Sequence, residues 1–258
     1  MIFRMGRGGK SKWVLSGLLF SALLAYAALA VHFRIFPFYE LKAVKIYIMP
    51  DHDGRYYERQ KAFSACEDCV YDIVMVGDSL IDHGDWGALI PFRKIANRGI
   101  SGDDTRGVLE RMDSILDTGA RRAFIMLGIN DIYEEADVDG VVFNYKKIIA
   151  TLLQHGIRPV IQSTLYVGPE DVRLRPKITA LNNRLEVFAR HHSGVDFIDL
   201  NHALSHAVEL NGEYSSDGLH LNKAGYVAWV CYLLTKGYIV PPPQADLSVV
   251  MPHCVRDL

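Results

Sequence analysis

Short apolar runs alternate with longer amphipathic stretches from Tyr71 onward, and this alternation limits the possible folds more than any other feature of the sequence. It predicts strands at 73–76, 123–127, 159–163 and 195–199, a weaker strand near 95–97, and helices at 105–116, 138–155, 177–191 and from 222 onward. Strands that alternate with helices of this length form a parallel sheet with helices on both faces. Ligands of such folds bind at the carboxyl ends of the strands, so the residues after each apolar run are the candidates for function.

The bulk composition suits one folded domain with a short additional segment. The chain has 258 residues, and 50% of them are hydrophobic, which is enough to bury a core and argues against disorder. The net charge of −2 and the isoelectric point near 6.5 provide no basic surface for nucleic acid. A nucleic-acid partner is therefore not expected.

The N-terminal segment combines a basic tail, 1–12, with an uncharged apolar run from Trp13 to Val31. The cations of the tail are Arg4, Arg7, Lys10 and Lys12. As a helix the run would span roughly 28 Å, close to the hydrocarbon thickness of a bilayer. By the positive-inside tendency the tail stays cytoplasmic and the rest is exported. A bacterial periplasm is the favoured destination, with the endoplasmic-reticulum lumen as the alternative.

A cleaved signal peptide is the main alternative to a transmembrane anchor, because 28–30 is Ala-Leu-Ala, a small-residue cleavage site. Signal peptides usually have apolar cores of about 7–15 residues, and this run is longer. Aromatic residues also gather at its exit, as they do at membrane interfaces. The prediction is therefore an uncleaved anchor, a connector with one helix at 32–70, a main domain at 71–237 and a peripheral tail at 238–258.

The four cysteines, Cys66, Cys69, Cys231 and Cys254, would lie in an oxidising compartment after export. A structural zinc site is not favoured, because a second close pair of ligands is missing. A redox site is not favoured either, because 66–69 precedes a predicted strand instead of opening a helix. One or two disulfides are expected, with three possible pairings, and an unpaired buried thiol at Cys231 is the alternative.

The first predicted strand is followed by Gly77-Asp78-Ser79-Leu80. A serine at a strand-to-helix turn lies where the helix N-terminus stabilises negative charge beside its hydroxyl. The motif differs from the GxSxG elbow of α/β-hydrolases, because Ile81 stands two positions after Ser79. On its own such a tripeptide is more often a helix cap than a nucleophile.

Two further strand ends carry residues that suit the binding of an oxyanion. The loop at 97–105 includes Gly102, and its glycines allow backbone N–H groups to point at an anion. Asn130 follows the run at 123–127 and offers an uncharged N–H donor. In isolation, a loop before a capped helix and an Asn-Asp turn explain the two motifs equally well.

Asp217 and His220 stand three residues apart in the last motif, Asp-Gly-Leu-His. This spacing lets both side chains face the same way within one turn, so that the carboxylate can orient the imidazole. A helix start with an incidental histidine is the alternative, and no third ligand nearby supports a metal site. The chain order Ser, Asp, His fits nucleophilic acyl transfer.

Together the four segments resemble the conserved blocks of the SGNH (GDSL-type) hydrolase superfamily, named for Ser, Gly, Asn and His. They occur in the same order and cover roughly residues 71–237. The second block, Asn-Arg-Gly-x-Ser-Gly-Asp, is most similar to the platelet-activating-factor acetylhydrolase and acetylesterase branch. The resemblance implies a three-layer α/β/α sandwich with a parallel five-stranded, flavodoxin-like sheet.

The resemblance also implies a role for each matching residue. Ser79 would be the nucleophile of a serine esterase, and Asp217 and His220 would complete its triad. The N–H groups of Ser79 and Gly102, with the side-chain amide of Asn130, would form the oxyanion hole. The reaction would pass through an acyl-serine and needs no metal, nucleotide or organic cofactor.

The substrate is constrained less than the chemistry. The connections around the site are short and none resembles a large apolar lid, which favours acetyl or another short acyl group on a carbohydrate or lipid-derived carrier. Trp86, Tyr166 and Arg173 are candidate substrate-binding residues, although a core tryptophan and a solvated loop explain them equally. An O-acyltransferase that uses the same acyl-serine and a non-catalytic, membrane-tethered glycan-binding module are the alternatives.

Overall fold

The computed structural model describes residues 54–63, 70–245 and Cys254. The basic tail, the apolar run from Trp13 to Val31, Cys66 and Cys69 lie outside these residues, so the predicted anchor stays a prediction. Within the described part of the chain, no helix is both long and apolar enough to cross a bilayer.

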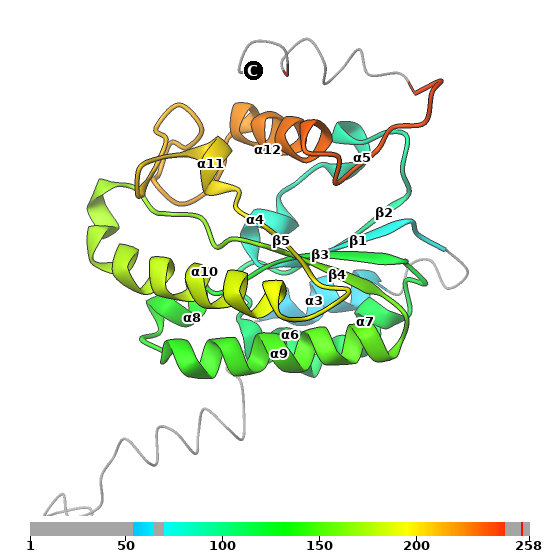
Figure 1. Ribbon diagram of the computed structural model, residues 1–258, viewed down its shortest axis with the longest axis horizontal. Helices are drawn as coiled ribbons and strands as arrows, with labels where there is room; N and C mark the ends of the chain where they lie inside the picture. Colours follow the sequence, from blue (N-terminus) through cyan, green and yellow to red (C-terminus); the bar gives the residue numbers. More distant parts are fainter. Residues whose placement is uncertain (1–53, 64–69, 246–253, 255–258) are drawn as a thin grey trace, which may run out of the picture. The chain divides into compact units, whose positions relative to one another are not determined.

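A parallel sheet forms the centre of the described domain, with the strand order β2-β1-β3-β4-β5 (Figure 1). The strands are β1 (Ile73–Gly77), β2 (Ile95–Gly99), β3 (Arg122–Met126), β4 (Arg158–Gln162) and β5 (Asp196–Ile198). Each pairing between neighbouring strands of this sheet is parallel. The order is flavodoxin-like, so the predicted five-stranded parallel sheet is confirmed.

Helices cover both faces of the sheet and complete the predicted three layers (Figure 1). One face carries α4 (Ser79–Asp82), α5 (Trp86–Leu89), α11 (Asn201–Leu204) and α12 (Lys223–Thr235). The other carries α6 (Thr105–Glu110), α7 (Met112–Leu116), α8 (Ile129–Tyr133), α9 (Val138–Gln154) and α10 (Arg175–Arg190). Because side chains of a strand alternate between faces, Ile73 and Met75 belong to the first core, whereas Val74 and Val76 belong to the second.

The helix predicted at 105–116 is two helices, α6 and α7, because the backbone leaves helical geometry at Arg111 (φ −112°, ψ 23°). The Arg111 side chain is buried, and its guanidinium hydrogen-bonds the Asp103 carboxylate and the Gly77 carbonyl oxygen. The break therefore coincides with a buried polar contact, which apolar periodicity cannot predict.

Apolar periodicity gave no signal for several short elements, although the motif at Ser79 already predicted a helix start there. These are α4, α5, α8, α11, the 3-10 helix η2 (Pro169–Leu174) and the antiparallel hairpin of β6 (Ser205–His206) and β7 (Glu209–Leu210). None exceeds six residues, which is too short to establish a hydrophobic period. Local capping fixes two of them, because the side chains of Asp78 and Asp85 accept main-chain N–H groups at the starts of α4 and α5.

Helix α3 (Gly54–Ala62) lies in the segment predicted as a connector, and it packs on the domain. Tyr56 and Phe63, which follows the helix, are buried together with Ile100. The Tyr56 hydroxyl donates a hydrogen bond of 3.3 Å to the Gly107 carbonyl oxygen, which lies in α6. The end of the predicted connector therefore contacts the segment that follows β2.

Cys231, in α12, forms a disulfide with Cys254. The prediction of a disulfide is therefore confirmed, and the alternative of an unpaired buried thiol at Cys231 is wrong. Cys254 is buried in the core beside α12, so the bond fastens this part of the C-terminal tail to the domain.

Candidate active site

Ser79 lies at the carboxyl end of β1 and is the first residue of α4. Asp78 caps this helix, because its Oδ1 accepts a main-chain N–H at 3.0 Å from two residues further on. A Cβ at Gly77 would lie 2.4 Å from both the Ile81 side chain and the Met126 carbonyl oxygen. Glycine before the Asp-Ser pair is therefore required for the tight packing of this strand-to-helix turn.

Ser79, His220 and Asp217 form one continuous chain of hydrogen bonds. Ser79 Oγ lies 2.9 Å from His220 Nε2, and His220 Nδ1 lies 2.8 Å from Asp217 Oδ2. The three residues are thus brought together in the arrangement that the sequence predicts. This order of groups is the one in which an imidazole can remove a proton from a hydroxyl while a carboxylate orients the ring.

The Asp217 carboxyl keeps its negative charge. Partial burial acts to raise its pKa, but hydrogen bonds from the ring and main chain of His220 and from the Leu219 N–H outweigh burial and hold the pKa well below its usual value. A carboxylate at this position accepts from Nδ1–H, which leaves Nε2 to accept from the Ser79 hydroxyl.

Gly102 lies in the loop after β2, and Asn130 lies in α8, which follows β3. The strands β2 and β3 flank β1, whose carboxyl end precedes Ser79. Gly102 has a φ of +81°, a left-handed conformation that favours glycine, and the space where its Cβ would lie is open. The Asn130 side-chain Nδ2 donates to the Asp103 carbonyl oxygen at 2.8 Å. An amide NH₂ carries two N–H groups, so this bond orients the side chain and uses only one of them.

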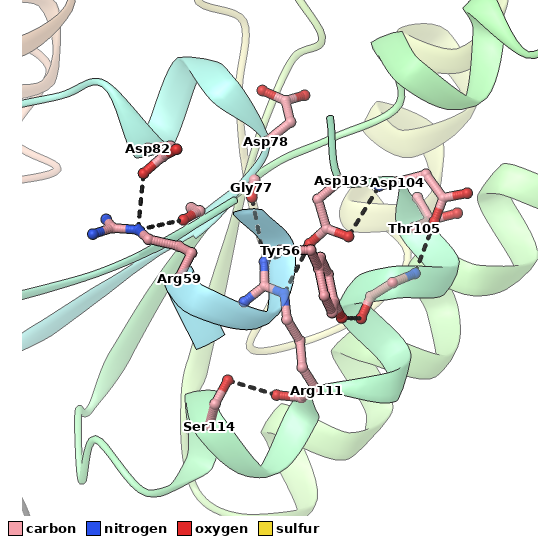
Figure 2. A network of polar contacts seen from close by, with 12 residues as sticks. Tyr56, Arg59, Gly77, Asp78, Asp82, Asp103, Asp104, Thr105, Arg111 and Ser114 are labelled. Carbon is pink, nitrogen blue, oxygen red and sulfur yellow. Dashed lines mark hydrogen bonds and ion pairs between the residues drawn. The ribbon is translucent and has the colours of Figure 1, made fainter. Parts of the chain in front are cut away.

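A buried ion pair supports the loop after β2. Arg111 lies 2.7 Å from the Asp103 carboxylate, and neither side chain is exposed to solvent (0% for both). Figure 2 shows the guanidinium between Asp103 and the Gly77 carbonyl oxygen, to which it donates at 3.3 Å. The pair therefore connects the residue after Gly102 to the end of β1.

A second buried carboxylate joins the start of α6 to α8. Asp131, next to Asn130, accepts hydrogen bonds from the Thr105 main-chain N–H and hydroxyl. Burial raises the pKa of Asp131 to about 7, and burial raises the pKa of Asp78 to about 7 as well. The site therefore rests on carboxyl groups held in a poorly solvated interior.

Sequence reasoning did not identify Asp103, Asp131 or Arg111 as supports of the site. Arg111 is one of several charged residues in the predicted helix at 105–116, so nothing in the sequence singled it out. Such residues are usually solvated, so the pattern alone gave no reason to place this side chain in the core.

Trp86 is not at the site. It is 2% exposed, its indole N–H donates to the Ile81 carbonyl oxygen, and it packs edge-on against Trp229. The structure therefore places this candidate substrate-binding residue in the core between the sheet and α12, for which a tryptophan is well suited.

The other two candidate substrate-binding residues follow β4, with Tyr166 in the loop and Arg173 in η2. A main-chain hydrogen bond joins this segment to the loop that carries Asp217 and His220. The Gly168 N–H donates to the Gly218 carbonyl oxygen at 2.7 Å. Tyr166 is partly buried, with its hydroxyl 3.0 Å from that of Thr179. Arg173 has a largely exposed side chain. This segment therefore borders the site, but among the described residues no hydrogen bond or ion pair joins Tyr166 or Arg173 to the triad.

Within the described residues, no group of three histidine, cysteine, aspartate or glutamate side chains has the arrangement of a metal site.

The model of the GDSL-like lipase/acylhydrolase family matches residues 75–228. Among curated proteins, the N-acylneuraminate cytidylyltransferase of Streptococcus agalactiae serotype V is 25% identical over 116 residues, 45% of this chain. The matched stretch spans only 28% of that relative's length.

Solved structures share the fold at lower identity. A protein from Streptococcus pneumonia, provisionally described as a platelet activating factor, is 24% identical with a TM-score of 0.67 over 79% of this chain and 99% of its own. A GDSL-like lipase from Bacteroides thetaiotaomicron is 21% identical with a TM-score of 0.62, over 71% and 96% of the two chains. A catalytic mutant of an acetylxylan esterase from Geobacillus stearothermophilus is 17% identical with a TM-score of 0.53, over 65% and 95%.

Proposed function

This chain belongs to the GDSL-like lipase/acylhydrolase family, and on that premise we propose that it removes short acyl groups, acetyl above all, from a carbohydrate or lipid-derived carrier. The predicted resemblance to GDSL-type hydrolases is confirmed by this membership, which supports the activity of a carboxylic ester hydrolase. The observation that carries the proposal is the hydrogen-bond chain from Ser79 through His220 to Asp217.

In the proposed first step, Ser79 Oγ attacks the ester carbonyl carbon while His220 Nε2 takes the hydroxyl proton. Asp217 holds the ring in the correct tautomer and stabilises the imidazolium that forms. The tetrahedral intermediate then collapses, and Nε2 returns the proton to the departing alcohol oxygen. The products of this step are the free alcohol and an acyl ester on Ser79.

In the second step a water molecule takes the place of the alcohol. His220 Nε2 removes one proton from this water as its oxygen attacks the acyl-serine carbonyl carbon. Collapse breaks the bond to Ser79 Oγ, which regains the proton from the imidazolium. The carboxylic acid leaves, and the enzyme returns to its starting state.

The negative charge on the carbonyl oxygen needs donors that are already in place. We assign this role to the main-chain N–H groups of Ser79 and Gly102 and to the Asn130 amide. Its support is the bond from Asn130 to the Asp103 carbonyl oxygen, which fixes the amide beside the loop that carries Gly102. Charge at this position is stabilised without reorganisation during the reaction.

A short acyl group on a polar carrier is supported by the surroundings of the site. Helix α4 begins at Ser79 and α8 at Ile129, so these strand-to-helix connections leave little chain to cover a long acyl group. One of the proteins to which the chain is similar has an acylated carbohydrate in its name, acetylxylan. A carbohydrate carrier is therefore preferred to a lipid-derived one.

Export of the domain and tethering by the segment from Trp13 to Val31 are part of the same proposal. Support comes from the uncharged run behind four cations and from the disulfide between Cys231 and Cys254. Disulfides persist in oxidising compartments and are rare in the cytosol. A periplasmic active site would meet the glycans of a cell envelope.

The proposal is tested with the full chain, purified in mild detergent and assayed on p-nitrophenyl esters of two, four and eight acyl carbons. The wild type should cleave the acetyl ester with the highest kcat/KM, and Ser79→Ala should be inactive on all three. Full activity of Ser79→Ala, or a preference for the eight-carbon ester, would contradict the proposal.

The same assay separates hydrolysis from transfer. Free acid should be the main acyl product when a soluble sugar is added as an acceptor alcohol. A sugar ester that forms in place of the acid would instead assign the chain as an O-acyltransferase that uses the same acyl-serine.

A further inference from the structure

A second polar chain lies beside the triad and has no part in the steps above. It consists of Asp82, His83 and Ser101. The Ser101 hydroxyl donates to Asp82 Oδ2 at 2.8 Å and lies 3.2 Å from His83 Nε2. The Ser101 main-chain N–H also approaches Asp82 Oδ2, at 3.3 Å.

Helix α3 fixes the base of this polar chain. Arg59 Nε lies 2.9 Å from Asp82 Oδ1 and donates to the Gly99 carbonyl oxygen at 3.2 Å. Figure 2 shows the contact between Arg59 and Asp82. The Asp82 side chain is only 20% exposed, and each of its oxygens has a partner, Arg59 at Oδ1 and the Ser101 hydroxyl at Oδ2. An exposed serine and histidine are thereby oriented in advance, which lowers the entropy lost when a ligand binds them.

The polar chain lies at the entrance of the catalytic site. The His83 main-chain N–H donates to the Ser79 carbonyl oxygen at 3.0 Å, one helical turn after the nucleophile. The ring centroids of His83 and His220 are 5.5 Å apart. Ser101 directly precedes Gly102, and both are exposed. The two side chains therefore border the space that a substrate must enter.

The chemistry of the reaction indicates which part of the substrate lies there. The departing alcohol oxygen receives its proton from His220 Nε2, so the alcohol portion of the ester must lie beside the His220 ring during this step. The neighbouring ring is that of His83, with the Ser101 hydroxyl hydrogen-bonded to it. The alcohol portion, and not the acyl portion, is therefore the part nearest to this pair.

We propose that His83 and Ser101 form a subsite for the hydroxyl groups of a polyhydroxylated alcohol, such as the sugar ring of an acylated carbohydrate. With its proton donated to Asp82, the Ser101 hydroxyl oxygen keeps a lone pair for a ligand, and the second ring nitrogen of His83 faces no partner in the pair. Sugar hydroxyls both donate and accept, so they can bond to both groups. An aryl or alkyl alcohol lacks these partners and gains no such bonds. This subsite rests on the proposed function and specifies its substrate class.

The competing role for the same contacts is positioning of the loop that carries Gly102. A loop-positioning role predicts that truncating the side chains lowers turnover equally for every ester, because the oxyanion is common to all of them. A hydroxyl-binding subsite predicts losses that depend on the alcohol and enter mainly through KM. The two roles are thus separable by the choice of substrate.

The experiment compares an acetylated methyl xyloside with p-nitrophenyl acetate, using the full chain and the variants His83→Ala, Ser101→Ala and the double variant. We expect the ratio of kcat/KM for the sugar ester to that for the aryl ester to fall about tenfold in each single variant and further in the double variant. His155→Ala, an exposed histidine on the turn after α9, is the matched control and should leave the ratio unchanged. Thermal unfolding of each variant checks that the fold is kept.

A second measurement removes the chemical step. Calorimetric titration of the acetylated methyl xyloside into Ser79→Ala and into Ser79→Ala/His83→Ala should show weaker binding by the double variant. Equal losses on both esters, or equal binding by the two Ser79 variants, would overturn the subsite while leaving the esterase in place. A wild type that hydrolyses neither ester would overturn the proposed function and the subsite together.

Discussion

The two loops that meet at Ser79 are held in opposite ways. The loop after β2 is joined to the interior: Asp103 pairs with Arg111 at full burial, and Thr105 bonds the buried Asp131. The loop with Asp217 and His220 lies at the surface, with side chains that are 52% and 36% exposed. It is held by its own turn and by one main-chain bond from Gly168 to Gly218.

This difference matches what the proposed reaction asks of each loop. Donors to a developing oxyanion must be rigid before the charge appears, and a buried network provides that rigidity. A catalytic imidazole needs a correct tautomer and one fixed direction, and a single charged carboxylate supplies both. Changes in the buried loop should therefore alter stability together with turnover, whereas changes in the exposed loop should alter turnover alone.

The largest effect is expected for Asp217→Asn, on the exposed side. The substitution keeps the shape and an oxygen for the turn but loses the charge that selects the tautomer of His220. We expect kcat to fall by about 10⁴-fold. The free energy of unfolding in urea should change by less than about 1 kcal/mol, because the side chain is half exposed. A large loss of stability with little loss of kcat would contradict the claim that changes in the exposed loop alter turnover alone.

Arg111→Met should produce the largest loss of stability, on the buried side. The substitution leaves the Asp103 carboxylate buried without its cation, and breaking such a pair costs about 3–5 kcal/mol. Urea unfolding measures this loss, and kcat should fall with it because the loop before α6 loses its support. In Arg111→Met/Asp103→Leu the uncompensated charge is removed, so much of the stability should return. A loss below about 1 kcal/mol in the single variant would contradict the account.

Asn130→Ala should lower kcat by about 10²–10³-fold with little change in KM, because the amide acts on the transition state. Asn183 is a matched control, since it is an exposed asparagine on α10. Asn183→Ala should keep kcat within about twofold of the wild type. A pure KM effect of Asn130→Ala would remove this residue from the oxyanion hole.

A further effect is a pH dependence of stability to which Asp131 contributes. Burial raises its folded pKa to about 7, above roughly 3.9 in the unfolded chain, so the folded state binds the proton more tightly. Its contribution to stability is complete below about pH 4 and is lost as the pH rises to about 7. Asp131→Asn should therefore become more stable relative to the wild type between pH 4.5 and 7.5 in urea titrations. A stability difference that is constant over this range would contradict the burial argument.

Motifs at strand ends allowed the nucleophile to be predicted from the sequence, because a parallel sheet brings the ends of distant strands to one edge. The oxyanion loop was located in the same way through Gly102 and Asn130. Asp217 and His220 lie well after β5, so they were assigned by their spacing and by the family resemblance.

The supports of the site could not be predicted in this way. Arg111 interrupts the predicted helix, and its side chain lies in the core. Its hydrogen bonds to the Asp103 carboxylate and the Gly77 carbonyl oxygen hold it there, and helical periodicity contains no information about them. Trp86 follows Ser79 closely in sequence but packs away from the site against Trp229. Such tertiary contacts override local patterns, since they depend on partners that the pattern does not contain.

The central claim, that Ser79 is the nucleophile, is tested most directly by covalent labelling. The full-length protein is treated with a serine-reactive phosphonate, and the modified peptide is identified by mass spectrometry, with Ser79→Ala and His220→Ala treated in parallel. The account predicts one label on Ser79 of the wild type, none in Ser79→Ala and much slower labelling of His220→Ala. A wild type that hydrolyses esters but carries its label on another residue would contradict the account.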